Sequence, residues 1–253
     1  MRVIRSKLLA VGALLAGLGQ TALAADPGVA DQTLAPDTGL GGGRPWKLTL
    51  ADYQYSDYSG RDFNLRWQRS ETHAWLGAYT DRVFGSQGRA GVDTSVDLGH
   101  SVQLQPSLQV ATEGFLGGSL NVQAGESWFA LAGIGRTNLK PYFNLNFDPN
   151  DALTFGAGHH TADGSVYTLF VVADDRLHTH QRDWHFNVRI PVSDMRATLD
   201  ILRKSGLSDA GYITAWGFSA TWDWPVWFVR LARDPYQNFS AQSAWRFAGG
   251  MRF

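Results

Sequence analysis

The sequence predicts an all-β protein, a closed antiparallel transmembrane β-barrel of about 12–14 strands. Three observations lead to this fold class. Apolar and polar residues alternate with period two from Trp46 to the end of the chain, in segments of roughly ten residues separated by turn residues. No stretch after the first 24 residues approaches the ~20 apolar residues that a membrane-spanning helix needs. The final segment, residues 243–253, alternates apolar or aromatic residues with small or cationic ones and ends on Phe253.

The start of the chain has the three regions of a secretory signal peptide. Arg2, Arg5 and Lys7 form a positive region, residues 8–18 form an apolar run, and small residues ending at Ala24 offer a cleavage site. We therefore expect residues 1–24 to be removed on export. The formal net charge of −1 includes +3 from this leader, which leaves about −4 on the mature chain. No clustered basic footprint remains, so nucleic acid is not an expected partner.

Composition narrows the expectation further. The chain has no Cys, which excludes disulfides and thiolate metal sites, and we expect neither a metal nor a cofactor. It is rich in Gly (28), Trp (10), Tyr (8) and Phe (14), and aromatic residues on alternating strands are typical of the girdles at membrane interfaces. Residues 25–45 contain Ala, Asp, Gly and Pro without periodicity, which predicts a flexible periplasmic lead-in before a barrel over residues 46–253.

The alternation can be followed along the barrel region in order. The clearest predicted strand segments are residues 63–68, 92–98, 102–110, 120–123, 139–147, 184–190 and 195–201. Short turns are expected at residues 59–61, 85–88, 125–126, 137–138, 148–151, 162–164, 191–194 and 222–225. Three longer connections, residues 174–182, 204–211 and 234–241, fall on one side if the last strand runs toward the periplasm. Long loops outside and short turns inside are the asymmetry of outer-membrane barrels.

A secreted soluble β protein is the competing fold. A β-propeller adds a repeat of roughly 40 to 50 residues, and the chain shows none. A β-sandwich of about 100 residues would be shorter and less regular in its apolar face. The regular alternation over the whole chain favours the barrel.

Two segments resemble known outer-membrane proteins. The end of the chain, with Trp245, Phe247, Met251 and Phe253 on one face, resembles the terminal strand of Gram-negative outer-membrane barrels. That resemblance implies that these residues form the signal read by the barrel assembly machinery. The stretch Tyr53-Gln-Tyr-Ser-Asp-Tyr-Ser-Gly60 resembles the opening of YaiO-type outer-membrane proteins, which are also short, signal-bearing chains that end in an aromatic residue. This second resemblance implies a location in the cell outer membrane and a fold, and very little chemistry.

The polar face of the predicted strands would line the lumen. It is rich in amides with scattered cations, which suits hydrogen bonding to sugar hydroxyls, whereas an ion filter would show rings of one charge. We therefore expect a non-enzymatic barrel for passage or export of a polar solute, with polysaccharide as one candidate, or a structural role in the envelope. Outer-membrane lipid and lipopolysaccharide are expected to surround it. The predicted lumen-lining residues are Asn64, Arg66, Gln68, Gln103, Gln105, Gln109, Asn144, Asn146, His185, Asn187, Arg189 and Arg246.

The alternative function is a barrel enzyme that acts on lipid A or surface peptides. Its candidate residues are His160, His178, Asp174 and Asp175, because Asp with His at the outer rim could activate water, as in omptin-type outer-membrane proteases. A compact His-x-Ser motif of the lipid A deacylase kind is absent, since Ser165 follows His160 by five positions. A long exposed loop would collect the same polar residues without any catalysis, and this is the simpler interpretation.

Overall fold

The computed structural model describes residues 43–145 and 148–253. The predicted signal peptide and most of the predicted lead-in therefore lie outside the described residues. The described chain is all-β, with two short 3₁₀ turns, η2 (Thr112–Gly114) and η3 (Gln237–Phe239). No helix in these two ranges has the length and apolar character needed to cross a membrane. The strands are β1 (Trp46–Tyr55), β2 (Ser59–Arg69), β3 (Thr72–Asp81), β4 (Gly85–Thr94), β5 (Val96–Asp97), β6 (Val102–Ala111), β7 (Phe115–Gly125), β8 (Trp128–Thr137), β9 (Ala152–His160), β10 (Val166–Asp174), β11 (Arg182–Val192), β12 (Met195–Ser208), β13 (Gly211–Asp223), β14 (Trp227–Asp234) and β15 (Ala244–Arg252).

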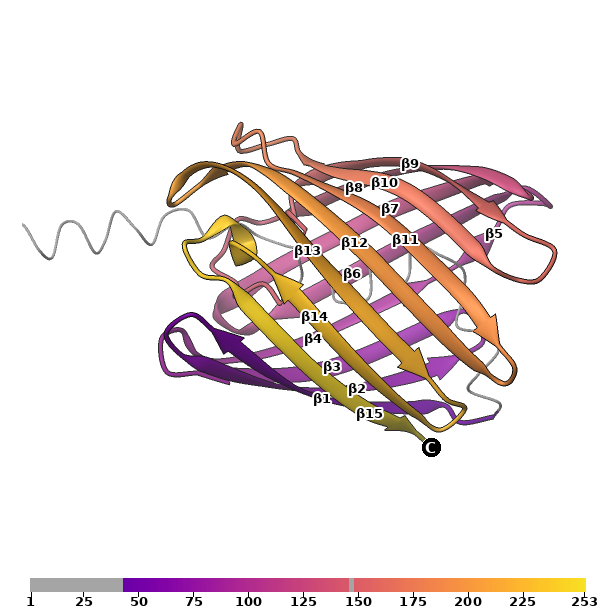
Figure 1. The fold of residues 1–253 in the computed structure, drawn as a ribbon, viewed down its shortest axis with the longest axis horizontal. Helices are drawn as coiled ribbons and strands as arrows, with labels where there is room; N and C mark the ends of the chain where they lie inside the picture. Colours follow the sequence, from indigo (N-terminus) through magenta and orange to yellow (C-terminus); the bar gives the residue numbers. More distant parts are fainter. Residues whose placement is uncertain (1–42, 146–147) are drawn as a thin grey trace, which may run out of the picture.

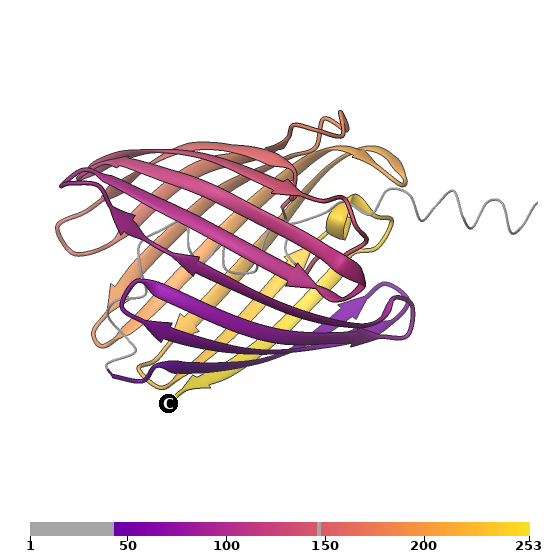
Figure 2. The same ribbon diagram turned by 180° about the vertical axis from the view of Figure 1, so that it is seen from behind.

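These strands close into an antiparallel barrel (Figures 1 and 2). Each long strand pairs with its neighbours in the chain, β15 pairs with β1, and β4 pairs directly with β6. The two-residue β5 pairs only with the start of β6, outside this circuit. Fourteen strands therefore form the wall, which confirms the predicted fold class and agrees with the upper end of the predicted strand number.

The first and last strands meet as the sequence predicts. Trp46 N–H donates to the Phe253 carbonyl and Phe253 N–H donates to the Trp46 carbonyl, both at 3.0 Å, and the register continues with Lys47 opposite Arg252. Closure leaves neither end strand with an open edge, which removes a template for pairing with other chains.

Removing Phe253 is expected to lower the amount of barrel in the outer membrane more than it lowers the stability of the assembled barrel. Its side chain is 50% exposed, so its loss removes little packing, whereas the resemblance of the terminal strand gives it a role in assembly. Outer-membrane levels and urea unfolding of the truncated protein test this, with Phe253→Tyr as the aromatic control. Equal outer-membrane levels for all three proteins would contradict the assignment.

Alternation along each strand separates the two faces of the wall. Outward positions carry exposed apolar side chains such as Leu50 (56%), Trp216 (63%) and Leu169 (52%). Inward positions carry most of the buried polar residues, such as Asp62 and Lys204. An apolar exterior around a polar interior is the arrangement that a lipid-embedded barrel requires.

Three of the predicted boundaries are wrong. Residues 59–61 were expected as a turn, but they form the start of β2. Residues 204–211 were expected as a long connection, but β12 runs to Ser208 and β13 begins at Gly211, so only two residues form the turn. The Ser208 hydroxyl stabilises this turn by donating to the Gly211 carbonyl and accepting from Ala210 N–H. Residues 85–88 were expected as a turn because of their glycines, yet they form the first part of β4.

The strand predicted over residues 139–147 is also wrong. No strand is present between β8 and β9 in the described residues 138–145 and 148–151, which together we call the inserted segment. Tyr142, Asn144 and Leu145 are at most 1% exposed, because this part of the segment folds into the barrel instead of joining the wall. Its alternating pattern has another cause: its residues contact inward-facing aromatic and polar groups of the lumen.

Candidate functional site: the barrel lumen

The inserted segment is anchored to the β3–β7 side of the lumen. The Gln87 side chain of β4 pairs with the Phe143 backbone like a strand neighbour, accepting from its N–H at 2.7 Å and donating to its carbonyl at 3.0 Å. The Phe143 ring stacks on Tyr79 of β3, with 4.6 Å between centroids. Tyr142 stacks on Phe115 of β7 at 4.2 Å and accepts a hydrogen bond from the Gln109 side chain of β6.

The same segment also contacts the opposite wall. The Asn144 carbonyl accepts hydrogen bonds from the side chains of Gln237 and Asn238 in η3, at 3.2 and 2.8 Å. Asp148 Oδ1 lies 2.7 Å from Nε2 of His185 on β11, and the other ring nitrogen of His185 lies 2.8 Å from Asp200 on β12. When both carboxyl groups are ionised, both bonds form together only if the imidazole carries a proton on each ring nitrogen. The inserted segment therefore crosses the lumen and is held at both sides.

Aromatic side chains fill the lumen at the level of this segment. Leu145 is completely buried against a cluster of inward-facing residues, namely Ala51, Tyr53, Tyr55, Tyr79 and Ala244. The connection between β1 and β2 extends this packing, since Tyr58 stacks on Tyr55 at 4.4 Å. Burial, with added repulsion from Asp81 and Asp57, raises the pKa of Tyr58 to about 12, so its hydroxyl stays neutral at physiological pH. The inserted segment thus narrows the passage by packing against these aromatic side chains.

Most charges in the lumen lie on β1–β4 and β11–β15, where many of them form ion pairs. The buried Asp183 of β11 is an exception, since neither carboxylate oxygen has a hydrogen-bond partner among the described residues. Arg89 of β4 lies 2.9 Å from Asp62 of β2. Asp93 is shared by Arg66 at 2.9 Å and His73 at 2.7 Å. On the other strands, Lys204 Nζ lies 2.6 Å from Asp234, and Asp223 accepts from Arg252 at 2.7 Å and from Arg196 at 3.4 Å. Paired charges hold neighbouring strands of this side together.

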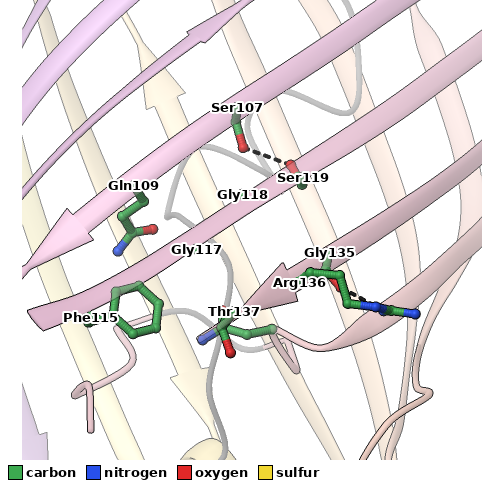
Figure 3. Close-up of a pocket in the computed structure, with 10 residues that line it drawn as sticks. Ser107, Gln109, Phe115, Gly117, Gly118, Ser119, Gly135, Arg136 and Thr137 are labelled. Atoms are coloured by element: carbon green, nitrogen blue, oxygen red, sulfur yellow. Dashed lines mark hydrogen bonds between the residues drawn. The ribbon is translucent and has the colours of Figure 1, made fainter. Parts of the chain in front are cut away.

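The wall formed by β6, β7 and β8 carries no charged residue at its inward positions within the described strands. Its inward side chains include amides, hydroxyls and small residues, together with the buried apolar residues Phe115, Phe129 and Leu131. The polar and small residues are Gln103, Gln105, Ser107, Gln109, Ser119, Asn121, Gln123, Gly133, Gly135 and Thr137. The hydroxyls of Ser107 and Ser119 share a hydrogen bond of 2.7 Å across the strands (Figure 3).

A small hollow of about 20 Å³, room for about one water molecule, lies along this wall, next to the inserted segment. Its lining includes Gln109, Phe115, Ser119 and Thr137, which Figure 3 shows on neighbouring strands, and Asn150 of the inserted segment. The Asn150 side chain is buried, and its amide oxygen and nitrogen have no hydrogen-bond partner among the described residues. The uncharged wall and the hollow therefore offer hydroxyl and amide groups to a polar solute or to water.

A close backbone contact positions the inserted segment against this wall. The Asn150 carbonyl lies so near Gly135 that an added Cβ would come within 2.4 Å of it. Backbone oxygen cannot move away as a flexible side chain would, so only glycine allows this approach. Glycine at position 135 therefore lets Asn150, near the end of the inserted segment, lie directly on β8.

Gly135→Ala is expected to destabilise the barrel by about 1–3 kcal/mol, because the new methyl group displaces the inserted segment from β8. Urea unfolding followed by tryptophan fluorescence measures the change. Gly88→Ala is the matched control, since its added Cβ would meet only a Thr112 methyl group at 3.5 Å, an ordinary contact. Equal stability of the two variants would show that the contact at Gly135 is not close.

Most residues predicted to line the lumen lie on the inward face of the strands. These are Asn64, Arg66, Gln68, Gln103, Gln105, Gln109, His185, Asn187, Arg189 and Arg246. Asn144 differs, because it belongs to the inserted segment rather than to a strand, and Asn146 lies outside the described residues. The residues of the predicted assembly signal, Trp245, Phe247 and Phe253, are exposed on the outer surface.

The four candidate catalytic residues are not brought together. His160 ends β9 and pairs with Val166, whereas Asp174 pairs with Ala152 at the other end of the same two strands, eight residues away. At about 3.4 Å per residue this separation is roughly 27 Å.

Asp174 instead accepts hydrogen bonds from Leu177 N–H and from Thr179, which shapes the loop after β10. Asp175 pairs with Arg136, and His178 is exposed in that loop. In the parts of the chain that the structure describes, no three His, Asp or Glu residues are grouped to bind a metal ion.

Several inward-facing residues are not evident from the sequence pattern. Gln87 and Arg89 were hidden because the surrounding glycines indicated a turn, and Lys204 because it was taken as the start of a loop. Asp62 could have been found, since it lies two residues before Asn64 on a predicted alternating strand.

Comparisons with known proteins identify the fold. No protein-family model matches the chain, and no curated protein is similar to it in sequence. Among solved structures, the outer membrane protein Omp33 of Acinetobacter baumannii is similar, with 8% identity, a TM-score of 0.54, and coverage of 83% of this chain and 98% of that one. A bacterial polysaccharide outer membrane secretin (8% identity, TM-score 0.46, 83% and 99% covered) and the KdgM porin (9%, 0.44, 82% and 99%) are more distant.

The likeness to Omp33 and the closed fourteen-strand wall agree with the predicted fold. The resemblance to YaiO-type proteins is not confirmed by any of these comparisons. The chain has the closed antiparallel β-barrel fold of outer-membrane proteins.

Proposed function

We propose that this protein is a non-enzymatic outer-membrane channel that passes uncharged polar solutes of the carbohydrate class along the β6–β8 wall. The observation that carries the proposal is the uncharged inward face of these three strands, set opposite strands whose charges are paired. Amides and hydroxyls exchange hydrogen bonds with sugar hydroxyls at little cost, whereas a charged solute would need an opposite charge at this wall.

The inserted segment gives this channel its size limit. It occupies part of the lumen and contacts the neutral wall through Tyr142 and Asn150, so it narrows the passage along that wall. The proposal includes two finer expectations from the sequence: an association with polysaccharide and a relation to YaiO-type proteins.

Osmotic swelling of liposomes that contain the purified barrel tests the proposal. Mono- and disaccharides are expected to permeate faster than sugar acids of the same size, and planar bilayers should show small, steady conductance. Liposomes that exclude all solutes, together with no conductance from the correctly folded barrel, would replace the channel by a structural role in the envelope.

A further inference from the structure

Arginine and tryptophan side chains alternate across the outer surface of five neighbouring strands, β11 to β15. Figure 1 shows these strands side by side. In the strand register, Arg203 lies between Trp184 and Trp216, and Arg233 lies between Phe218 and Trp245. The three tryptophans are 40%, 63% and 38% exposed, so they project outward. We call Trp184, Arg203, Trp216, Arg233 and Trp245 the arginine–tryptophan surface.

Among the described residues, the two arginines have no charged partner. Arg233 lies over the Trp245 ring at 5.5 Å, and neither guanidinium forms a hydrogen bond or ion pair with another described residue. The outward positions of β11 to β15 carry no Asp or Glu. An arginine that faces lipid is unfavourable deep in a bilayer and becomes acceptable near headgroups, so this surface belongs at a membrane interface.

The position of the surface along the strands selects the interface. Both arginines lie toward the strand ends that bear the longer connections, residues 175–181 and 235–243, and away from the end where the chain terminates. Long loops face outward in outer-membrane barrels, so this end meets the outer leaflet. The arginines therefore face the headgroup layer of the outer leaflet.

An apolar hollow lies next to this surface on the same strands. It has a volume of about 900 Å³, is open to the outside, and is lined mainly by outward-facing apolar residues, including Val188, Leu199, Leu231 and Phe247. Small residues at Ala197, Ala220 and Gly249 form its floor between larger neighbours. Each strand reaches the hollow two to six residues beyond the arginine–tryptophan surface, in the direction of the membrane centre.

From these features we infer a binding site for a phosphorylated, multiply acylated lipid of the lipid A class. Its phosphates bind Arg203 and Arg233 by charge-assisted hydrogen bonds, which guanidinium groups form well with phosphate oxygens. Its acyl chains occupy the hollow, where they contact apolar side chains, and the tryptophan rings lie at the level of the headgroup. The site requires the outer-membrane location but not the proposed transport of sugars.

The test compares lipid retention by native mass spectrometry of the full-length processed protein purified in detergent. The probes are hexa-acyl lipid A with two phosphates, the same lipid without phosphates, and inorganic phosphate. The double variant Arg203→Gln/Arg233→Gln should retain the bis-phosphorylated lipid at least about tenfold more weakly than the unchanged protein. The dephosphorylated lipid should bind both proteins weakly and equally, and inorganic phosphate alone should not be retained.

Two further variants separate the site from general effects. Arg69→Gln removes an exposed arginine from the periplasmic end of β2 and should leave retention unchanged. Gly249→Leu should weaken retention by filling the hollow, since an added Cβ there meets the nearest atom at an ordinary 3.5 Å. Heat-modifiable gel migration confirms that each variant is folded.

Three outcomes would each overturn the assignment. The double variant could retain the bis-phosphorylated lipid as strongly as the unchanged protein, Arg69→Gln could lose as much retention as the double variant, or the unchanged protein could bind the dephosphorylated lipid as strongly as the bis-phosphorylated one. Sugar permeation should stay unchanged in the double variant, so failure of this site leaves the channel proposal standing.

Discussion

Replacing residues 139–149 with a short Gly-Ser linker is expected to raise the single-channel conductance several-fold. The segment crosses the lumen between Gln87 and Gln109 on one side and His185 and η3 on the other, so its removal opens the cross-section that it occupies. A fourteen-strand wall is wide enough to leave an aqueous lumen once this filling is gone, whereas an eight-stranded wall is not. Planar-bilayer recordings measure the change.

The barrel should survive this replacement, because the pairs that close the wall, β1 with β15 and β4 with β6, do not include the segment. Lys140→Ala is the control within the same segment: its side chain is exposed, and conductance should not change. A folded variant with the conductance of the unchanged protein would show that the segment does not limit the passage.

Lys204→Met is expected to destabilise the barrel by about 3–5 kcal/mol, the usual cost of removing one partner from a buried ion pair. Lys204 is completely buried, its ammonium lies 2.6 Å from Asp234, and it stands opposite Asp183 in the strand register. Without the ammonium, two buried carboxylates lose their counter-charge. Urea unfolding of the barrel in lipid, monitored by heat-modifiable gel migration, measures the loss of stability.

The double variant Lys204→Met/Asp234→Met should recover part of this stability, because it removes one of the two uncompensated charges together with its partner. Lys140→Met, at an exposed position, should leave stability unchanged. If Lys204→Met unfolds at the same urea concentration as the unchanged protein, the ion pair does not stabilise the wall.

The faces of the strands were predictable because alternation is a local property. Where a strand is paired on both sides, as in β11, lipid and lumen impose opposite polarity on successive residues, and His185, Asn187 and Arg189 can be assigned to one face by counting. The same counting failed over residues 139–147. An extended segment that crosses a lumen between aromatic and polar groups shows period two as a strand does, and only the absence of pairing partners distinguishes it.

Turn prediction failed for a different reason. Glycines at positions 85 and 88 indicate a turn when considered alone, but pairing with β3 holds both of them in β4. The same strand also needs glycine where it meets a large inward side chain. Gly91, for example, lies against the Trp75 ring, where an added Cβ would come within 2.5 Å. Such a contact joins different strands, so the sequence of one segment does not reveal it.

The amino-acid sequence by itself determined the fold class, the alternation of the wall and the meeting of the first strand with the last, because these depend on period, turn residues and the order of segments. Only the tertiary structure decided that residues 142–145 lie inside the lumen, that the charges gather on one side of it, and that Arg203 and Arg233 share an outer surface above an apolar hollow. These features depend on the closure of fourteen strands, which brings together residues up to about two hundred positions apart, as in the contact between Tyr53 and Arg246.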